Sequence, residues 1–134
     1  MLTQLFPFLD PIHATPDLIV RLRALADDTA RLQQVRSVSP AMLRSAPRLK
    51  YWVPVQRPEG LRLIGQVSGH PLIKRPMIMT SPLWFADPEG RWVRTLSRYY
   101  RLGPPASSVE ADLLLSLQIA MRDTADDKTS EDGV

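Results

Sequence analysis

Apolar residues near the N-terminal end recur at steps of three or four positions and predict an amphipathic helix. The stripe runs through Leu18, Leu22 and Leu25 and continues to about Arg36. Thr15, followed directly by proline and aspartate, is a typical helix start, because threonine caps free backbone N–H groups and aspartate favours the positive end of the helix dipole. We expect this helix to pack on the core and to keep a charged face in solvent.

The first 15 residues are rich in leucine and phenylalanine but are interrupted by Pro7 and Pro11. Proline removes a backbone donor and breaks helical hydrogen bonding, so no regular helix is expected there. The pattern predicts an extended lead that packs on the core. The alternative is an exposed apolar arm that docks on a partner.

Two further helices are expected. Ser39, followed by proline, repeats the capping signal and predicts a short helix that ends before Pro47. Ser107 and Glu110 have the spacing of a capping box and predict a C-terminal helix with a leucine-rich stripe. That stripe fits a core-facing helix and equally a homodimer interface, because a short chain gains burial by pairing.

Between these helices the hydrophobic period shortens to two, which is typical of strands. Residues 49–55 and 61–67 are the first two expected strands. A second hairpin is expected from Met77 to Tyr100, with a tight turn at residues 87–90. The strand after that turn is predicted to run without a break from residue 91.

The predicted fold class is α+β. A small, bent antiparallel sheet or SH3-like partial barrel is expected over residues 48–101, flanked by an N-terminal and a C-terminal helix. The 134 residues suffice for one hydrophobic core, so we expect one domain over residues 1–125. Residues 126–134 are acidic, and a disordered tail is expected there.

The composition is that of an ordinary soluble protein, with 44% hydrophobic and 23% charged residues. Cysteine is absent, which excludes disulfides and thiolate chemistry and fits a reducing compartment. No apolar run approaches the roughly 20 residues that span a bilayer, and the first residues lack the features of a signal peptide. We therefore expect a cytoplasmic protein with no membrane contact.

Charge is distributed unevenly along the chain. Residues 1–37 carry four arginines and four acids, residues 38–104 carry eleven basic and three acidic residues, and residues 105–134 carry two basic and seven acidic ones. The three segments therefore have net charges of 0, +8 and −5, which sum to the +3 of the chain. A basic body suggests a polyanionic partner. The alternative is that the acidic end simply neutralises the body.

The strand predicted from residue 91 is the sharpest candidate for a binding surface. On an extended strand, Trp92, Arg94, Arg98 and Tyr100 share one face, where arginine pairs with phosphate and an aromatic ring stacks on a base. This predicts a site for nucleic acid or an acidic protein. The alternative is that the aromatic residues are core and the arginines pair with nearby acids. The candidate site residues are Lys74, Arg75, Trp92, Arg94, Arg98, Tyr100 and Arg101.

Three motifs carry a resemblance to a known family: GQVSGHP at residues 65–71, TSPLW at 80–84 and WVRTLSRYYRLG at 92–103. The chain resembles a family of small uncharacterised bacterial proteins, a domain of unknown function, with the pattern GxVxGHP, TSxLW and W[AV]RTxSRxYRLG. The resemblance implies one domain with one fold. It implies no catalytic residue.

An enzyme is the least favoured interpretation. His70, Thr80, Ser81 and Asp87 provide a base, two hydroxyls and a carboxylate on paper, but no nucleophile elbow accompanies them. The two histidines have no recognised metal-ligand spacing, so no metal or cofactor is expected. The sequence thus predicts a non-enzymatic binding module with a basic, aromatic β-surface for nucleic acid. The alternative is a protein–protein adaptor or accessory protein that uses the N-terminal arm or the C-terminal helix.

Overall fold

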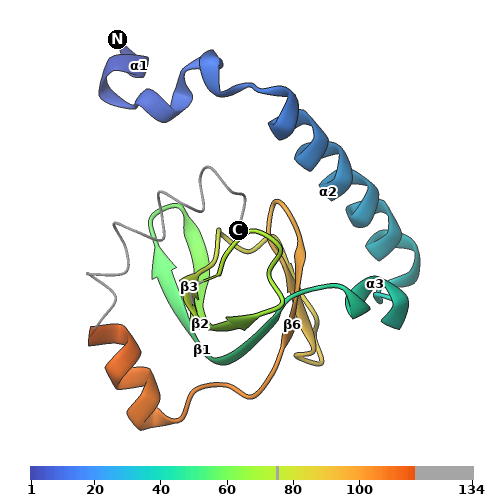
Figure 1. Ribbon diagram of the computed structural model, residues 1–134. Coiled ribbons are helices and arrows are strands. Elements are labelled where there is room, and N and C mark those ends of the chain that lie inside the picture. The colour runs from blue at the N-terminus through green and yellow to red at the C-terminus, as the bar shows by residue number, and fades with distance from the viewer. Residues whose placement is uncertain (75, 117–134) are drawn as a thin grey trace.

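The computed structural model describes residues 1–74 and 76–116 of the chain, and it has helices at both ends and strands between them (Figure 1). The acidic tail predicted at 126–134 lies outside these residues, as does Arg75. The helices are α1 (Leu2–Leu5), the 3-10 turns η1 (Pro7–Leu9) and η2 (Pro11–His13), α2 (Pro16–Val35), α3 (Pro40–Arg44) and residues 108–116. The strands are β1 (Arg48–Arg57), β2 (Gly60–Ser68), β3 (Met77–Met79), β4 (Phe85–Ala86), β5 (Trp92–Arg94) and β6 (Tyr99–Leu102).

The strands form one six-stranded sheet in the order β3-β2-β1-β6-β5-β4. The pair β1 and β6 is parallel, and the other neighbours are antiparallel. The predicted α+β class is confirmed. The sheet is mixed rather than antiparallel, and it is open rather than closed, so the SH3-like barrel is not confirmed.

The hairpin predicted from Met77 to Tyr100 is wrong in its pairing. Strand β3 pairs with β2, whereas β4 pairs with β5 and β5 pairs in turn with β6. The predicted tight turn is present, because the N–H of Gly90 donates to the carbonyl of Asp87 at 2.8 Å and Gly90 has a φ of 77°. The strand predicted from residue 91 is interrupted by a second turn at Thr95, which separates β5 from β6.

Helix α2 begins as its sequence predicts. The Thr15 hydroxyl accepts a hydrogen bond from the N–H of Leu18 at 3.2 Å. The face turned toward the sheet is a mixed stripe: Leu25 is its one buried residue, and half-buried Leu18, Arg21, Asp28 and Leu32 lie above and below it. No helix in the described ranges is long and apolar enough to cross a membrane.

Residues 1–14 do not pack on the core, so the predicted extended lead is wrong. Their backbone turns through α1, η1 and η2, and every one of their side chains is exposed. The two prolines begin the two 3-10 turns, where a missing N–H costs little. Asp10 caps the second turn by accepting from the N–H of Ile12 at 2.9 Å. Figure 1 shows this arm standing clear of the sheet.

The remaining helices both pack against the sheet. Ser39 caps α3 through the N–H of Met42 at 3.3 Å, as predicted. The predicted capping box is also confirmed, since the N–H of Ser107 donates to Glu110 at 2.9 Å and the N–H of Glu110 donates back to Ser107 at 3.2 Å. Leu114 of this last helix packs into a cluster with three residues of the sheet.

Candidate nucleic-acid interface

Arg94 is part of the interior, although the sequence places it on a binding strand. Its side chain is 1% exposed. Its Nε and one terminal nitrogen lie 3.0 and 2.9 Å from the same carboxylate oxygen of Asp28, and its other terminal nitrogen donates to the Thr95 carbonyl at 2.7 Å. The guanidinium also lies 5.2 Å from the centre of the Tyr99 ring. Arg94 therefore ties α2 to the sheet.

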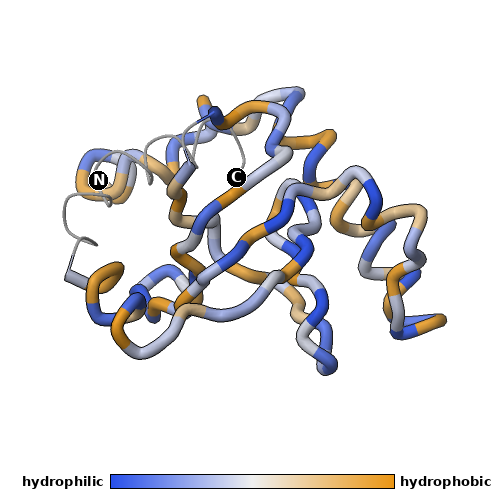
Figure 2. The backbone as a smooth tube through the Cα atoms, turned by 60° about the horizontal axis from the view of Figure 1, so that its bottom comes forward, coloured by the Kyte–Doolittle hydropathy of each residue, from blue (hydrophilic) through white to orange (hydrophobic). Residues whose placement is uncertain are grey.

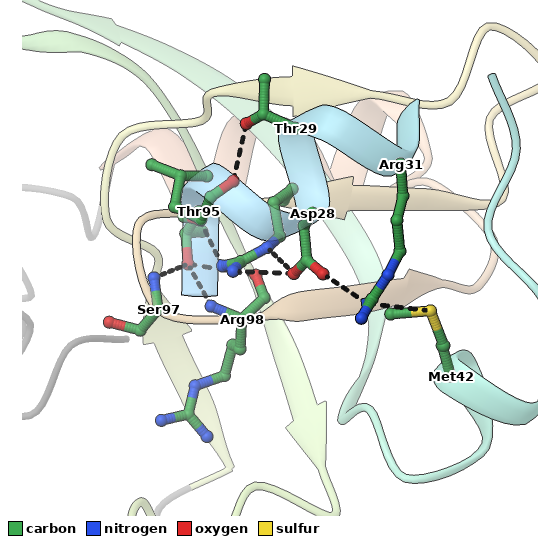
Figure 3. Close-up of polar contacts among 9 residues, drawn as sticks. Asp28, Thr29, Arg31, Met42, Thr95, Ser97 and Arg98 are labelled. Atoms are coloured by element: carbon green, nitrogen blue, oxygen red, sulfur yellow. Dashed lines mark hydrogen bonds and ion pairs between the residues drawn. The ribbon is translucent and has the colours of Figure 1, made fainter. Parts of the chain in front are cut away.

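Asp28 is the hub of this network and joins three elements. Its second oxygen accepts from Arg31 at 3.1 Å, and the same Arg31 nitrogen lies 3.8 Å from the sulfur of Met42 in α3 (Figure 3). Burial raises the pKa of Tyr99, and the negative charge of Asp28 raises it further. The ring beside Arg94 is therefore neutral at physiological pH.

The turn after β5 explains why the predicted surface does not exist. The Thr95 hydroxyl accepts from the N–H groups of Ser97 and Arg98, both at 3.4 Å (Figure 3). This turn reverses the chain, so Trp92 and Tyr100 lie on opposite faces of the sheet instead of sharing one. Trp92 is 3% exposed and Tyr100 is 0% exposed.

The prediction that Trp92, Arg94 and Tyr100 form a binding surface is therefore wrong, because all three side chains are buried in the core. The alternative interpretation holds for the two aromatic residues, and the acid that pairs with Arg94 comes from α2. Burial raises the pKa of Tyr100, whose hydroxyl has no hydrogen-bond partner in the described part of the chain. A phenol so enclosed offers no contact to a ligand.

The other predicted site residues are scattered. Lys74 is exposed in the loop before β3, and Arg75 lies outside the described residues. Arg98 is half-buried and lines a cavity of about 310 Å³ between α2, α3 and the Thr95 turn. Arg101 lies directly opposite Trp92 in the β5–β6 pair and is half-buried. Among these residues, Arg101 is the one that lies beside other basic side chains and forms a basic surface with them.

That surface is built mainly from strand β1, which sequence reasoning missed. Arg48 is the register partner of Arg101 across the parallel pair, and Lys50 follows on the same face. Leu49, between them, points to the opposite face and is 0% exposed. Arg48 and Lys50 are exposed, and we call the surface of Arg44, Arg48, Lys50 and Arg101 the basic face.

Gly103 leaves room for two of these basic side chains to lie close together. A Cβ atom at this position would lie 2.9 Å from Cγ of Lys50 and 3.2 Å from Nε of Arg48. Both side chains therefore cross over a glycine, where no side chain would push them apart. Arg101 is anchored beside them by a hydrogen bond from its Nε to the Ala46 carbonyl at 2.9 Å.

Arg44 of α3 extends the basic face to a cavity of about 340 Å³. Arg44 and Arg101 both line this cavity, and Leu43 and Trp92 form its apolar wall. Arg91 also lines the cavity, but it is paired with Asp87 at 2.8 Å and Glu89 at 3.3 Å. In the described ranges, none of the four residues of the basic face makes an ion pair.

An irregular stretch of β1 follows the basic face. The register with β2 shifts between Lys50 and Val53, and Tyr51 takes a left-handed φ of 52°. The N–H of Tyr51 donates to the Pro104 carbonyl at 2.7 Å, which fixes this bulge against the end of β6. Tyr51 is 36% exposed. An exposed aromatic residue thus follows directly after the cations.

The residues that could form a catalytic group by sequence alone, among them His70 and Thr80, have local structural roles. Nδ1 of His70 accepts from the N–H groups of Leu72 and Ile73 at 3.0 and 3.1 Å, so the imidazole caps a turn. The Thr80 hydroxyl accepts from the N–H of Leu63 at 3.1 Å and donates to the Ser81 carbonyl at 2.9 Å. These contacts join strand ends and turns and provide no nucleophile with its base.

Asp87 is held as a carboxylate by its own turn. Burial by itself would raise the pKa of Asp87, but hydrogen bonds from the Arg91 side chain and from the N–H groups of Glu89 and Arg91 outweigh it and lower that pKa. The carboxylate organises the β4–β5 turn. Within residues 1–74 and 76–116, no group of three metal-binding side chains is present.

The model of a family of unknown function, DUF6634, matches residues 15–126. No curated protein and no solved structure matches the chain.

Proposed function

We propose that this chain, which belongs to the family of unknown function DUF6634, is a binding module that holds nucleic acid on its basic face. The observation that carries the proposal is the grouping of Arg44, at the end of α3, with Arg48, Lys50 and Arg101 of the adjoining strands, without acidic partners among the described residues. Neighbouring strands lie about 4.8 Å apart, so cations on adjacent strands suit successive phosphates of a backbone.

The exposed ring of Tyr51 supports a nucleic acid over an acidic protein. Proteins that bind single strands combine a basic track with aromatic rings on which bases stack. Tyr51 directly follows Lys50 along β1 and is fixed by the bulge. Contacts to phosphate and stacking carry little sequence information, so we expect weak, sequence-tolerant binding.

The proposal is tested by fluorescence anisotropy with labelled single-stranded and double-stranded oligonucleotides at increasing salt. Four phosphate contacts predict a log–log slope of about −3 for single strands. The test variant carries Arg48→Gln and Lys50→Gln. The matched control carries Arg23→Gln and Lys74→Gln, which removes two exposed charges elsewhere and leaves the same net charge, 3 − 2 = +1.

We expect the test variant to lose binding by at least tenfold and the control to keep most of it. Circular dichroism checks that both variants stay folded. Equal losses in the two variants would mean that overall charge, and not the basic face, attracts the oligonucleotide. No binding at low salt would overturn the proposal, and binding of an acidic polypeptide in its place would identify the other class of partner.

A second candidate function is a protein–protein adaptor, which the exposure of residues 1–14 favours. The helical residues 108–116 add exposed Val109 and Leu113. The two candidate functions use different surfaces. Removal of residues 1–14 should therefore abolish an adaptor interaction and leave oligonucleotide binding unchanged, as measured by the same anisotropy titration.

A further inference from the structure

We propose that two copies of this chain form a two-fold dimer in which the N-terminal arm of each copy, residues 1–14, fills the cavity at the C-terminal end of α2 in the other copy. This interface is separate from the basic face. The arm precedes residue 15, where the family match begins, and the cavity lies within the matched range.

The arm is an apolar surface that its own chain leaves uncovered. Phe8 is 73% exposed and Ile12 is 75% exposed. The arm is nevertheless ordered, because Asp10 caps its second turn and the rings of Phe6 and Phe8 meet edge to face at 6.2 Å. Figure 2 shows hydrophobic positions recurring around the N-terminus. A prefolded apolar arm loses little conformational entropy when it docks.

A matching cavity lies at the other end of α2. It has a volume of about 350 Å³, and its walls include Leu32, Phe85 and Pro88. Val35, in the last turn of α2, is 66% exposed. A phenylalanine or leucine side chain from the arm fits such an apolar hollow by size and chemistry.

The charges of the two surfaces also match. Residues 1–14 carry one acidic side chain, Asp10, and no basic one. The cavity has one charged residue in its lining, Arg36, which caps α2 in a left-handed conformation with a φ of 62°. Arg36 is exposed and makes no ion pair to any residue in the described ranges. Docking of the arm brings the carboxylate to this guanidinium.

The geometry of α2 explains why the occupant is a second copy. A 20-residue helix is about 30 Å long, so the arm and the cavity of one copy lie at opposite ends of it. The folded arm cannot fill its own cavity. When two copies of α2 pack antiparallel, each arm meets the other cavity, and the two contacts are identical, as a two-fold interface requires.

The outer face of α2 suits such a crossing. Ile19 and Leu22 are exposed, at 46% and 45%, and Ala26 and Ala30 follow on the exposed surface of the helix. Small residues allow two helices to approach closely. A stable interface buries about 800 Å² per partner, and a buried aromatic side chain supplies roughly 150–250 Å² of it. Two arms, two cavities and the helix crossing all contribute to that area.

Sedimentation velocity of the full chain over a wide concentration range tests the dimer. We expect a species with twice the mass of the 15.1 kDa chain. Phe8→Asp should weaken association at least tenfold. The matched control Val109→Asp, which places the same charge on an equally exposed apolar position of the C-terminal helix, should leave it unchanged. A monomer at every concentration would overturn the proposal and leave the arm to another kind of partner.

Cross-linking tests the placement of the arm. The natural chain has no cysteine, so copies with Phe8→Cys mixed with copies with Pro88→Cys should form a mixed disulfide on mild oxidation. Copies with Val109→Cys mixed with the same Pro88→Cys copies should not. Equal cross-linking in both mixtures, or none in the first, would overturn the arm-in-cavity contact.

Charge exchange tests the same contact. Asp10→Arg and Arg36→Asp should each weaken the dimer several-fold, and the double variant should recover the part of the loss that the ion pair accounts for, although the cap of Asp10 on the N–H of Ile12 stays lost. A double variant as weak as the two single variants combined would exclude this ion pair.

Discussion

Arg94 and Arg101 belong to the same short motif but lie in regions of opposite character. Arg94 is enclosed beneath α2 and shares one carboxylate with Arg31. Arg101 lies on the same face of the sheet, at its parallel junction with β1, and makes no ion pair within the described part of the chain. The difference teaches that an arginine in a basic, aromatic motif is structural or ligand-binding according to what covers its strand. Residue type alone does not decide it.

The largest effect is expected where the enclosed region is broken. Arg94→Ala leaves Asp28 half-buried and short of one cation, and we expect a loss of about 3–5 kcal/mol in the free energy of unfolding. Urea denaturation followed by circular dichroism measures it. Arg94→Met keeps the volume but not the charge, and paired with Asp28→Leu it should recover much of the loss, because apolar packing often replaces a buried ion pair without cost.

A stability loss below about 1 kcal/mol in Arg94→Ala would contradict the enclosed role. It would also return Arg94 to the candidate binding residues. The same variant in the anisotropy titration provides a second check, since a structural arginine should alter oligonucleotide binding only through unfolding.

The helices of this fold are readable from local sequence because capping is local. Thr15, Ser39 and Ser107 each bond to a backbone N–H group close by in the chain, and all three helix starts are as predicted. The extended lead preferred for the first 15 residues is wrong because each proline begins a short turn of its own. Local signals therefore predict where helices begin but not what the arm packs against.

The sheet and the candidate site depend on contacts that the sequence pattern does not contain. The turn at Thr95 has neither glycine nor proline, and its cap is a threonine hydroxyl, so the segment reads as one strand. The basic face arises from the parallel pairing of Arg48 with Arg101, which lie far apart in the chain. The basic–apolar–basic order of residues 48–50 was the available signal, but their neighbour in β6 was not predictable from it.

Two glycines sharpen the comparison between backbone packing and the basic face. A Cβ at Gly65 would lie 2.9 Å from the Lys50 carbonyl oxygen and 3.1 Å from Cα of Trp52, so Gly65→Ala should cost about 1–3 kcal/mol of stability. A Cβ at Gly103 meets chiefly the flexible side chains of Lys50 and Arg48, so Gly103→Ala should cost less and should weaken oligonucleotide binding instead.

Thermal unfolding and anisotropy, measured on both glycine variants, separate these effects. We expect Gly65→Ala to melt earlier with its affinity per folded molecule intact. Gly103→Ala should keep most of its thermal stability and lose affinity for the oligonucleotide. If the two variants behaved alike, Gly103 would have no special relation to the cations.

An acid titration measures how much Asp87, the partner of Arg91 in the cavity wall, contributes to the stability of the fold. The pKa of Asp87 is lowered in the folded state from an ordinary value of 3.8, so the carboxylate stabilises the fold above that pH. The contribution is lost as the pH falls below 3.8 and through the lowered pKa. Asp87→Asn should cost about 1–2 kcal/mol at neutral pH and should flatten the fall in stability below pH 3.8. Urea denaturation at stepped pH measures both. An unchanged acid slope would mean that other carboxylates dominate it.

The smallest expected change in stability comes from the basic face, and it separates the two regions most sharply. Arg48 is exposed and makes no ion pair in the described ranges, so Arg48→Gln should change the free energy of unfolding by no more than about 0.5 kcal/mol. Removal of one phosphate contact should nevertheless reduce the salt slope of oligonucleotide binding by about 0.7–0.9. Arg23→Gln on α2 is the control and should alter neither quantity. A stable Arg48→Gln protein with an unchanged salt slope would remove Arg48 from the interface, while a large loss of stability would show that the exposed arginines, like Arg94, hold the fold together.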